Sequence, residues 1–405
     1  MLNIIENLNK LGKYFFWFLK KMTLLSINLI YFTPSLILKL LNIKFIDLHY
    51  QAIGHLIADA DTHIKQKQLN LIPNDRPVLL INSKKVANKY LLKYLRKYFT
   101  VIENPLLLFI LNPFLNSRII GVDIEHYSSA INKTAAISEV NSLWSMAKFD
   151  PLFFPFESDI SRGDQALNKL GVPKNNWFVC LHVRSSGFSI CEDLHLYRNS
   201  DFDSYIPSIK YIISLGGYCI RMGDSSMPTA PKIDGLIDYA HSDLKADWLD
   251  LYISSQCKFF IGTGSGASSM PFMFGVPILS VNVAPLSNVP QFGSRDLTIP
   301  KLYKYLSVND FIGFKSVFSS EMSNFRYNDL FEKNEILVIN NTSDEIKDAV
   351  EEMYLRISNQ WVTKKEDDEL QDRFISLLKE GHYSFKTSAK IGTSFLRKYK
   401  DLIDS

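Results

Sequence analysis

Residues 259–271 read Phe-Phe-Ile-Gly-Thr-Gly-Ser-Gly-Ala-Ser-Ser-Met-Pro, and residues 274–278 read Phe-Gly-Val-Pro-Ile. An apolar run stops at a loop of small residues, a helix-like segment follows, and a second apolar run begins after Gly-Val-Pro. Glycines let backbone N–H groups approach a ligand closely. Ser268 or Ser269 can cap the next helix, whose N-terminus favours anions. The loop therefore predicts a phosphate or diphosphate site, with a tight structural turn as the alternative.

Two familiar phosphate-binding motifs are excluded here. No Gly-Lys-Ser/Thr follows the loop, so it is not a Walker A loop. Gly264 and Gly266 have Ser269 where the dinucleotide-binding motif requires a third glycine.

The bulk composition is typical of a packed globular protein. A chain of 405 residues fits two domains of ordinary size. Hydrophobic residues make up 46% and charged residues 21%, as in folded proteins. The net charge of +3 argues against nucleic acid as a partner. The four cysteines form no Cys-x-x-Cys pair, which favours buried free thiols in a reducing compartment and argues against a zinc site.

The positive charge belongs to the N-terminus. Residues 1–45 hold six lysines and one glutamate, so their net charge is +5. An aromatic run at 14–19 precedes Lys20 and Lys21, and an uncharged stretch of 17 residues runs from Met22 to Leu38. We favour a helical segment lying in the interface of an anionic membrane. A spanning helix and a pair of core helices remain the alternatives.

Apolar runs that alternate with helical patterns predict a parallel α/β fold. We expect strands at 77–82, 99–102, 177–183, 218–221, 259–261 and 278–282, and helices at 88–98, 105–121, 203–215, 247–255 and 266–274. The predicted division is a membrane-associated helical segment (1–45), two Rossmann-like domains facing across a cleft (46–170 and 171–342) and C-terminal helices (343–405).

Polar side chains follow several of the predicted strands, where open parallel sheets bind ligands. His182 and Arg184 end one strand and, at period-two spacing, face the same side. An arginine there can bind two phosphate oxygens, although an ion pair with Glu192 or Asp193 is the alternative.

Other candidate groups lie along the second half of the chain. Arg221, Gly223 and Asp224 follow a second strand. Asp193 and Arg198 lie in a loop before a helix, and Lys301 supplies one more cation further along the chain. In the first half, Gly54 and His55 indicate an acceptor site with His55 as the catalytic base, or a neutral capping histidine.

No metal or other cofactor is predicted. Asp59-Ala60-Asp61 lies in a helical pattern, and Asp201-Phe202-Asp203 is typical of a helix cap. Charge neutralisation by Arg, Lys and helix N-termini is therefore favoured over a divalent ion.

These clusters, in this order, resemble a family of bacterial glycosyltransferases encoded among surface-polysaccharide genes. The matching pieces span residues 54 to 301: Gly54-His55-Leu56, 177–184, Tyr197-Arg198-Asn199, 216–223, Phe260-Ile261-Gly262 with Ser265-Gly266, 274–277 and Ile299-Pro300-Lys301. His182-Val183-Arg184 is also similar to the His-x-Arg element of fucosyltransferases with a GT-B fold, in which the arginine contacts the donor diphosphate. The Gly-Asp that often follows in those enzymes is absent here, which argues against a GDP-fucose donor.

The resemblance implies a GT-B-like enzyme with an acceptor domain at 46–170 and a nucleotide-sugar domain at 171–342. It implies sugar transfer to a lipid-linked or growing surface glycan, of lipopolysaccharide, O-antigen or capsule type, at the cytoplasmic face of the inner membrane. The expected donor site comprises His182, Arg184, Arg221, Gly223, Asp224, residues Gly262, Thr263, Gly264, Ser265 and Gly266, and Lys301. His55, Arg184 and Arg221 would be catalytic, and Gly54, Glu157, Asp193 and Arg198 would shape the acceptor side.

Three alternatives remain at this stage. Asp59 or Glu157 replaces His55 as the base in one. In another the chain is an inactive nucleotide- or glycan-binding scaffold of polysaccharide assembly. In the third it is a sugar epimerase or phosphate-releasing hydrolase, which would need no basic N-terminus.

Overall fold

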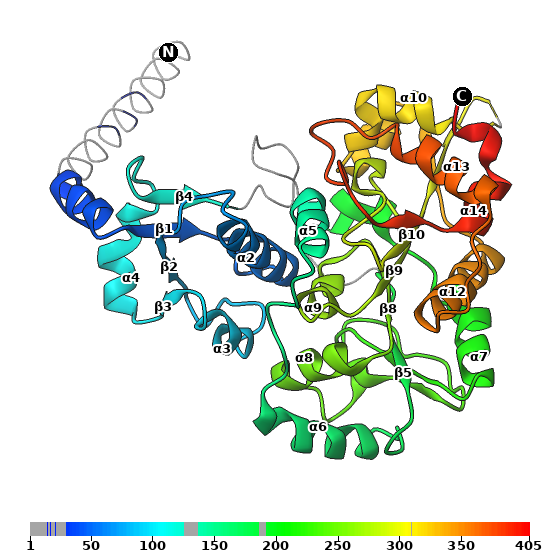
Figure 1. The fold of residues 1–405 in the computed structure, drawn as a ribbon, viewed down its shortest axis with the longest axis horizontal. Coiled ribbons are helices and arrows are strands. Elements are labelled where there is room, and N and C mark those ends of the chain that lie inside the picture. The colour runs from blue at the N-terminus through cyan, green and yellow to red at the C-terminus, as the bar shows by residue number, and fades with distance from the viewer. Residues whose placement is uncertain are drawn as a thin grey trace, which may run out of the picture.

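The structure, a computed structural model, describes residues 14, 17, 21, 30–124, 137–185, 192–308 and 310–405. Two lobes, each built on a parallel sheet, lie side by side (Figure 1). Among the described residues, no helix is both long enough and apolar enough to cross a membrane.

The N-terminal lobe contains a four-stranded parallel sheet in the order β3-β2-β1-β4. Its strands are β1 (Ile43–Asp47), β2 (Arg76–Leu80), β3 (Thr100–Ile102) and β4 (Gly121–Asp123). Its helices are α2 (Ile53–Gln68), α3 (Leu91–Leu95), α4 (Pro105–Leu111) with the short 3-10 turn η1 (Asn112–Phe114), and α5 (Ile137–Met146), which packs on α2.

The C-terminal lobe contains a seven-stranded parallel sheet in the order β13-β10-β9-β8-β5-β6-β7. Its strands are β5 (Phe178–His182), β6 (Tyr218–Arg221), β7 (Leu236–Ile237), β8 (Phe260–Thr263), β9 (Ile278–Val283), β10 (Leu297–Pro300) and β13 (Lys390–Ile391). Counted along the chain, this is the order 3-2-1-4-5-6 of a doubly wound fold, extended by one strand. The order reverses between β5 and β8.

Helices surround this sheet, so its central strands are buried on both faces. All residues of β8 and β9 are buried, as expected for apolar runs in a covered parallel sheet. The helices are α6 (Glu157–Lys169), α7 (Ile206–Ser214), α8 (Asp247–Gln256), α9 (Ser269–Met273), α10 (Phe314–Ser319), α11 (Asn328–Lys333), α12 (Ser343–Ile357), α13 (Lys365–Ile375) and α14 (Thr393–Lys398). A small antiparallel pair, β11 (Leu302–Tyr305) and β12 (Ile336–Ile339), lies beside them.

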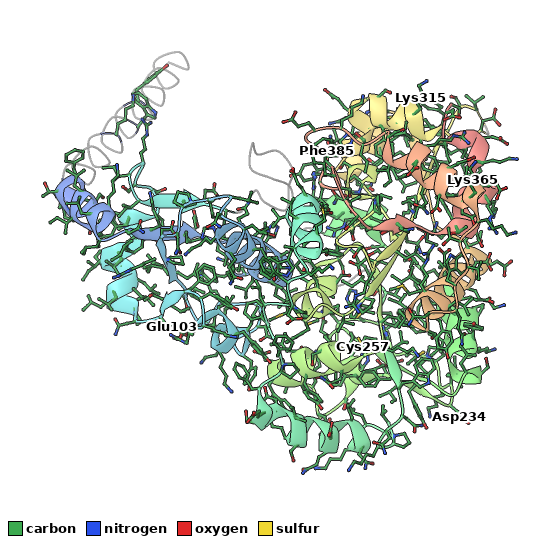
Figure 2. All side chains as sticks on the ribbon, viewed as in Figure 1. Glu103, Asp234, Cys257, Lys315, Lys365 and Phe385 are labelled. Atoms are coloured by element: carbon green, nitrogen blue, oxygen red, sulfur yellow. The ribbon has the colours of Figure 1, made fainter. Side chains whose placement is uncertain are left out.

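Three predicted free thiols are confirmed. Cys180, Cys219 and Cys257 are buried and form no disulfide, and Figure 2 places Cys257 inside the larger lobe. Burial raises the pKa of the Cys219 thiol to about 12. Cys191 lies outside the described residues.

The C-terminal segment returns to the N-terminal lobe before it forms β13. Tyr383 packs in a small cluster with Ala58 of α2 and Ile137 of α5. Lys386 bonds Glu139 at 2.8 Å, and the hydroxyls of Ser388 and Ser142 are 3.1 Å apart. The loop at 382–389 therefore fastens α5 to the larger lobe.

Several predicted boundaries differ from the structure. β1 crosses the predicted boundary at residue 45, so the sheet starts inside the predicted membrane segment. The helix predicted over 105–121 is α4, η1 and the start of β4, because Asn112-Pro113 interrupts it. α6 packs on α8 of the C-terminal lobe, so the chain changes lobe near 150–156 and not at 170. The segment 343–405 adds β13 to the sheet besides its helices.

Candidate functional site

The point where the strand order reverses brings the predicted phosphate-binding groups together. His182 at the end of β5 pairs in register with Gly262 of β8. Arg184 follows one strand end, and Gly264 and Ser265 follow the other. In open parallel sheets the crevice beyond these carboxyl ends is where ligands bind.

Hydrogen bonds join the two loops. The backbone N–H of Arg184 donates to Oγ1 of Thr263 at 2.9 Å, and Nδ1 of His182 lies 3.1 Å from Oγ of Ser265. Burial, with the nearby charge of Arg184, lowers the pKa of His182 to about 4. His182 is therefore a neutral imidazole at pH 7 that holds the serine of the loop.

A third segment, residues 197–200, also lies at the carboxyl ends of these strands. Nε of Arg198 donates to the carbonyl of Gly264 at 3.0 Å, and Nε of Arg184 donates to Oδ1 of Asn199 at 3.2 Å. The ammonium group of Lys301 donates to the carbonyls of Tyr197 and Asn199, at 2.7 Å each.

Lys301 supports the 197–199 segment from within the lobe. It follows β10, is 2% exposed, and donates two hydrogen bonds to backbone carbonyls of the 197–199 segment. Burial lowers its pKa to about 7. The structure thus gives Lys301 a supporting position, while the predicted direct contact with phosphate stays a prediction.

The charges of three arginines act on Tyr197. Burial raises the pKa of the Tyr197 hydroxyl, and the charges of Arg198, Arg326 and Arg184 oppose that rise. The hydroxyl donates to the carbonyl of Arg326 at 3.1 Å. Burial and the neighbouring charge of Arg198 act together to lower the pKa of Arg326. Such a concentration of positive charge beside a glycine-serine loop suits a polyanion.

Arg221 has a partner within its own lobe. It is 3% exposed, and its Nη1 donates to Asp238 at 3.1 Å. Asp238 also accepts from the backbone N–H of Ala230 at 2.9 Å. Arg221 therefore anchors the loop between β6 and β7, and a direct contact with a ligand stays a prediction.

Gly223 and Asp224 shape the turn that follows Arg221. Gly223 has a φ of +146°, and a Cβ there would lie 2.2 Å from Sδ of Met227, so only glycine fits. Oδ1 of Asp224 accepts the N–H of Ser226 at 2.8 Å.

The N-terminal lobe meets this edge at Gly54. A Cβ on Gly54 would lie 2.9 Å from Cα of Gly266, and a Cβ on Gly266 would lie 2.9 Å from the backbone nitrogen of Gly54. The first turn of α2 thus packs directly on the short turn η6 (Gly266–Ser268). Since α2 follows β1 and η6 follows β8, the carboxyl ends of both sheets face this junction.

His55 is the next residue after this contact, and it forms a dyad with Asp59. Nδ1 of His55 lies 2.9 Å from Oδ2 of Asp59, one turn further along α2. Asp59 is fully buried, while the side chain of His55 is 36% exposed. A carboxylate on Nδ1 fixes the tautomer with the proton there, so Nε2 carries the lone pair. This arrangement suits a general base.

A cavity of about 280 Å³ lies beside the dyad, at the carboxyl ends of β1 and β2. His49 lines it, and the His49 and His55 rings are 5.4 Å apart. Asn112 of η1 also lines it.

Two predicted residues are not placed at this site. Glu157 is the exposed first residue of α6. α6 packs against α8, and α8 lies between α6 and α9 (Figure 1). The side chain of Asp193 lies outside the part of the chain that the structure describes.

Sequence reasoning missed the contribution of Arg326 and of Asn282. Arg326 lies between the segments that form η8 (Glu321–Asn324) and α11, where no motif or periodicity marks it. Asn282 donates to Ser200 at 2.8 Å and to Tyr205 at 3.1 Å, so it fixes the 197–200 segment from β9. Its φ of +54° is unusual for a residue within a strand, but a sequence does not show backbone angles.

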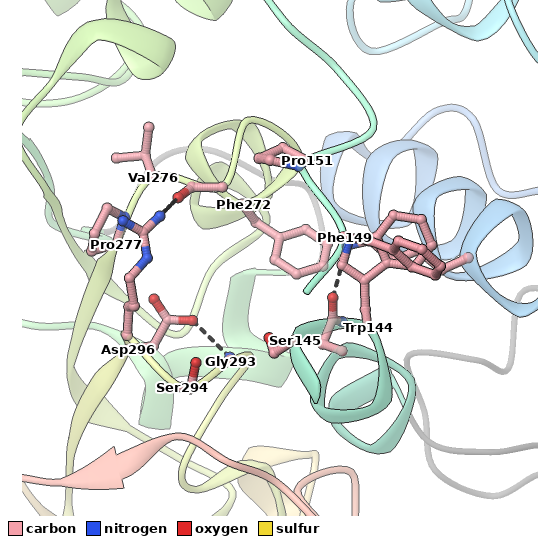
Figure 3. Close-up of a pocket in the computed structure, with 14 residues that line it drawn as sticks. Trp144, Ser145, Phe149, Pro151, Phe272, Val276, Pro277, Gly293, Ser294 and Asp296 are labelled. Atoms are coloured by element: carbon pink, nitrogen blue, oxygen red, sulfur yellow. Dashed lines mark hydrogen bonds between the residues drawn. The ribbon is translucent and has the colours of Figure 1, made fainter. Parts of the chain in front are cut away.

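A second cavity, of about 170 Å³, lies at the amino ends of β9 and β10 (Figure 3). Trp144, Phe149 and Phe272 form its apolar side. The carboxylate of Asp296 accepts backbone N–H groups of Ile278 and Gly293, at 2.7 Å each. Asp296 thus serves the start of β9 and the turn before β10, while Lys65 of the same lining donates to Oδ1 of Asn141 at 2.7 Å.

In the described part of the chain, no three His, Cys, Asp or Glu side chains are grouped so that they could hold a metal ion.

Comparisons with known proteins gave distant structural likenesses. No protein-family model matches, and no curated protein sequence matches. The chain is similar to a glycosyl transferase family 9 structure from Veillonella parvula DSM 2008, with 11% identity and a TM-score of 0.44 over 78% of this chain and 97% of that one. It is also similar to ADP-heptose LPS heptosyltransferase II from E. coli, with 11% identity and a TM-score of 0.40 over 64% and 90%. With these TM-scores below 0.5, neither likeness carries an argument about activity.

The Gly54–Gly266 contact yields a first prediction. Gly266→Ala should push α2 away from η6 and lower the free energy of unfolding by about 1–3 kcal/mol, as overpacking does. Gly264→Ala is the matched control, because its Cβ would find its nearest neighbour at 3.6 Å. Chemical denaturation of both variants makes the comparison, and equal stability of the two would contradict the proposed contact.

The buried imidazole of His182 yields a second prediction. Its pKa is about 4 in the folded protein and 6.5 ordinarily. Between these pH values the unfolded state binds the proton and the folded state does not, so the free energy of unfolding rises with pH from 4 to 6.5. His182→Asn should flatten this slope, measured by denaturation across the pH range.

His63→Asn is the matched control for that experiment. Burial lowers the pKa of His63, in α2, to about 4 as well. It should flatten the slope similarly while leaving ligand binding at the β5–β8 edge unchanged. A His182→Asn slope equal to that of the unmodified protein would contradict the assignment.

Proposed function

We propose that the chain is a glycosyltransferase that binds a sugar nucleotide at the carboxyl ends of β5 and β8 in the larger lobe. The observation that carries this proposal is that a cationic loop site in one lobe and a His–Asp pair in the other lie at the same lobe junction. Arg184, Arg198 and a glycine-serine loop lie on one side. A His–Asp dyad, one residue from the Gly54–Gly266 contact, lies on the other.

Each group suits one half of the transfer reaction. Nε2 of His55 takes the proton from an acceptor hydroxyl as its oxygen attacks the anomeric carbon of the donor. The bond from that carbon to the phosphate oxygen breaks, and the nucleoside diphosphate leaves with the electron pair. Arg184, Arg198 and the N–H groups of the loop stabilise the negative charge that develops, which is usually the largest catalytic contribution.

Several finer features belong to the same proposal. The two lobes would act as the two domains of a GT-B enzyme, with the acceptor on the α2 side. Arginine and lysine charges would replace a divalent ion. The basic N-terminus supports a lipid-linked or surface-glycan acceptor, of O-antigen or capsule type, at the cytoplasmic face of the inner membrane.

The first test is nucleotide binding. Calorimetric titration with ADP, UDP, GDP, CDP, CMP and dTDP should identify one that binds. Arg184→Ala and Arg198→Ala should each weaken that binding roughly 10- to 100-fold, because a hydrogen bond to a charged group contributes about 1.5–3 kcal/mol.

Arg373→Ala is the control for these variants. Arg373 is half-exposed and pairs with Asp404 on the outer surface of the larger lobe, so its loss should leave nucleotide affinity unchanged. The absence of binding by a folded sample to every nucleotide would refute the donor site.

The second test is turnover. His55→Gln should lower kcat by about 10²–10⁴, the usual contribution of a general base, without changing donor affinity. Release of nucleoside diphosphate is measured with the matching sugar nucleotide and a bacterial glycolipid extract.

Asp59→Asn should also lower kcat, and the double variant should be no slower than His55→Gln alone, because the two residues act as a unit. Nucleotide binding with no transfer or hydrolysis by the unmodified protein would instead support a non-catalytic scaffold.

A further inference from the structure

Two helical segments of the N-terminal lobe carry few polar side chains: one has none, and the other has Thr33, Ser35 and Lys39 besides Tyr31. They are residues 30–41 and α4, whose sequence is Pro-Leu-Leu-Leu-Phe-Ile-Leu. A surface helix ordinarily has one polar face, and a helix that is apolar all round belongs in a core or a membrane. No residue of α4 is buried.

The inner faces of the two segments pack together on the four-stranded sheet. The hydroxyl of Tyr31 donates to the carbonyl of Ile110 at 2.8 Å, and its ring meets Phe114 edge-on with centroids 4.9 Å apart. Leu38 and Leu108 pack against the same small core as Phe114. The segments therefore form one rigid unit, at the end of the molecule away from the larger lobe (Figure 1).

The outer faces of this unit present large apolar side chains to solvent. Phe109 is 81% exposed and Leu40 is 87% exposed. The others exposed here are Ile30, Phe32, Leu36, Ile37, Leu41, Leu106, Leu107 and Ile110. Scattered exposed apolar residues are normal, but a group of this size from two adjacent helices marks an interaction surface.

The charge of this unit is positive. Residues 30–46 and 104–122 contain Lys39, Lys44 and Arg118, and no aspartate or glutamate. Lys39 and Arg118 are exposed. The sequence immediately upstream supplies four more lysines, Lys10, Lys13, Lys20 and Lys21, against one glutamate.

We propose that residues 30–41 and α4 together form a docking face that lies in the interface of an anionic lipid bilayer. Apolar side chains would enter the boundary between headgroups and acyl chains, while the exposed Lys39 and Arg118 meet lipid phosphates. Positive charge without any carboxylate favours a lipid surface over a second copy of this chain, whose matching face would carry the same charge. The proposal does not depend on the chain being a transferase.

The test is co-flotation of the full chain with vesicles, without nucleotide. Binding is expected to vesicles of phosphatidylethanolamine with phosphatidylglycerol, and to be weaker to phosphatidylcholine alone. The double variant Leu106→Ser/Phe109→Ser should bind at least about tenfold more weakly, because it removes two apolar side chains from the interface.

Val362→Ser is the matched control, because Val362 is also 81% exposed but precedes α13 in the larger lobe. It should leave vesicle binding unchanged. Unchanged circular dichroism and thermal unfolding would show that the double variant is folded.

Two outcomes would overturn the proposal. One is equal vesicle binding by the unmodified protein and the double variant, as expected if this face is covered by residues 1–29. The other is absence of vesicle binding together with a dimer, seen by analytical ultracentrifugation, that the double variant converts to a monomer. Nucleotide binding by the double variant is measured in parallel, so the failure of the donor site would be seen separately.

Discussion

The contact between Gly54 and Gly266 is the constraint on which the candidate site depends. Two backbone segments from different lobes approach so closely that neither position has room for a Cβ. One segment begins the helix that carries His55 and Asp59, and the other closes the loop held by His182 and Arg198. A larger residue at either position would separate the His55–Asp59 pair from the loop at 264–266.

The larger lobe supports its side of the junction with buried polar bonds. The 197–200 segment has no regular secondary structure beyond a short 3-10 helix, yet Lys301, Asn282 and Arg184 each bond it from a different strand end. Buried polar groups that are fully bonded make a segment rigid and specify one conformation. Of the residues that hold Arg198 in place, Lys301 and Asn282 need not touch a ligand themselves.

The sequence predicted the strands that are apolar and buried on both faces, at 259–261 and 278–282, because such runs suit a covered parallel sheet. β1 was missed because Ile43–Asp47 closely follows the apolar N-terminal stretch and is too short to stand out from it. β10 was missed because Asp296 and Lys301 flank a run of only four residues. Arg326 could not be found, since its approach to Tyr197 depends on tertiary folding over more than a hundred residues.

The loop at 382–389 has a consequence for motion. The chain passes between the lobes near 150–156 and contacts the N-terminal lobe again through Tyr383, Lys386 and Ser388. The lobes also touch where α2 packs on η6. Any opening of the junction must therefore separate Gly54 from Gly266, and any twist across it must also detach the loop from α5.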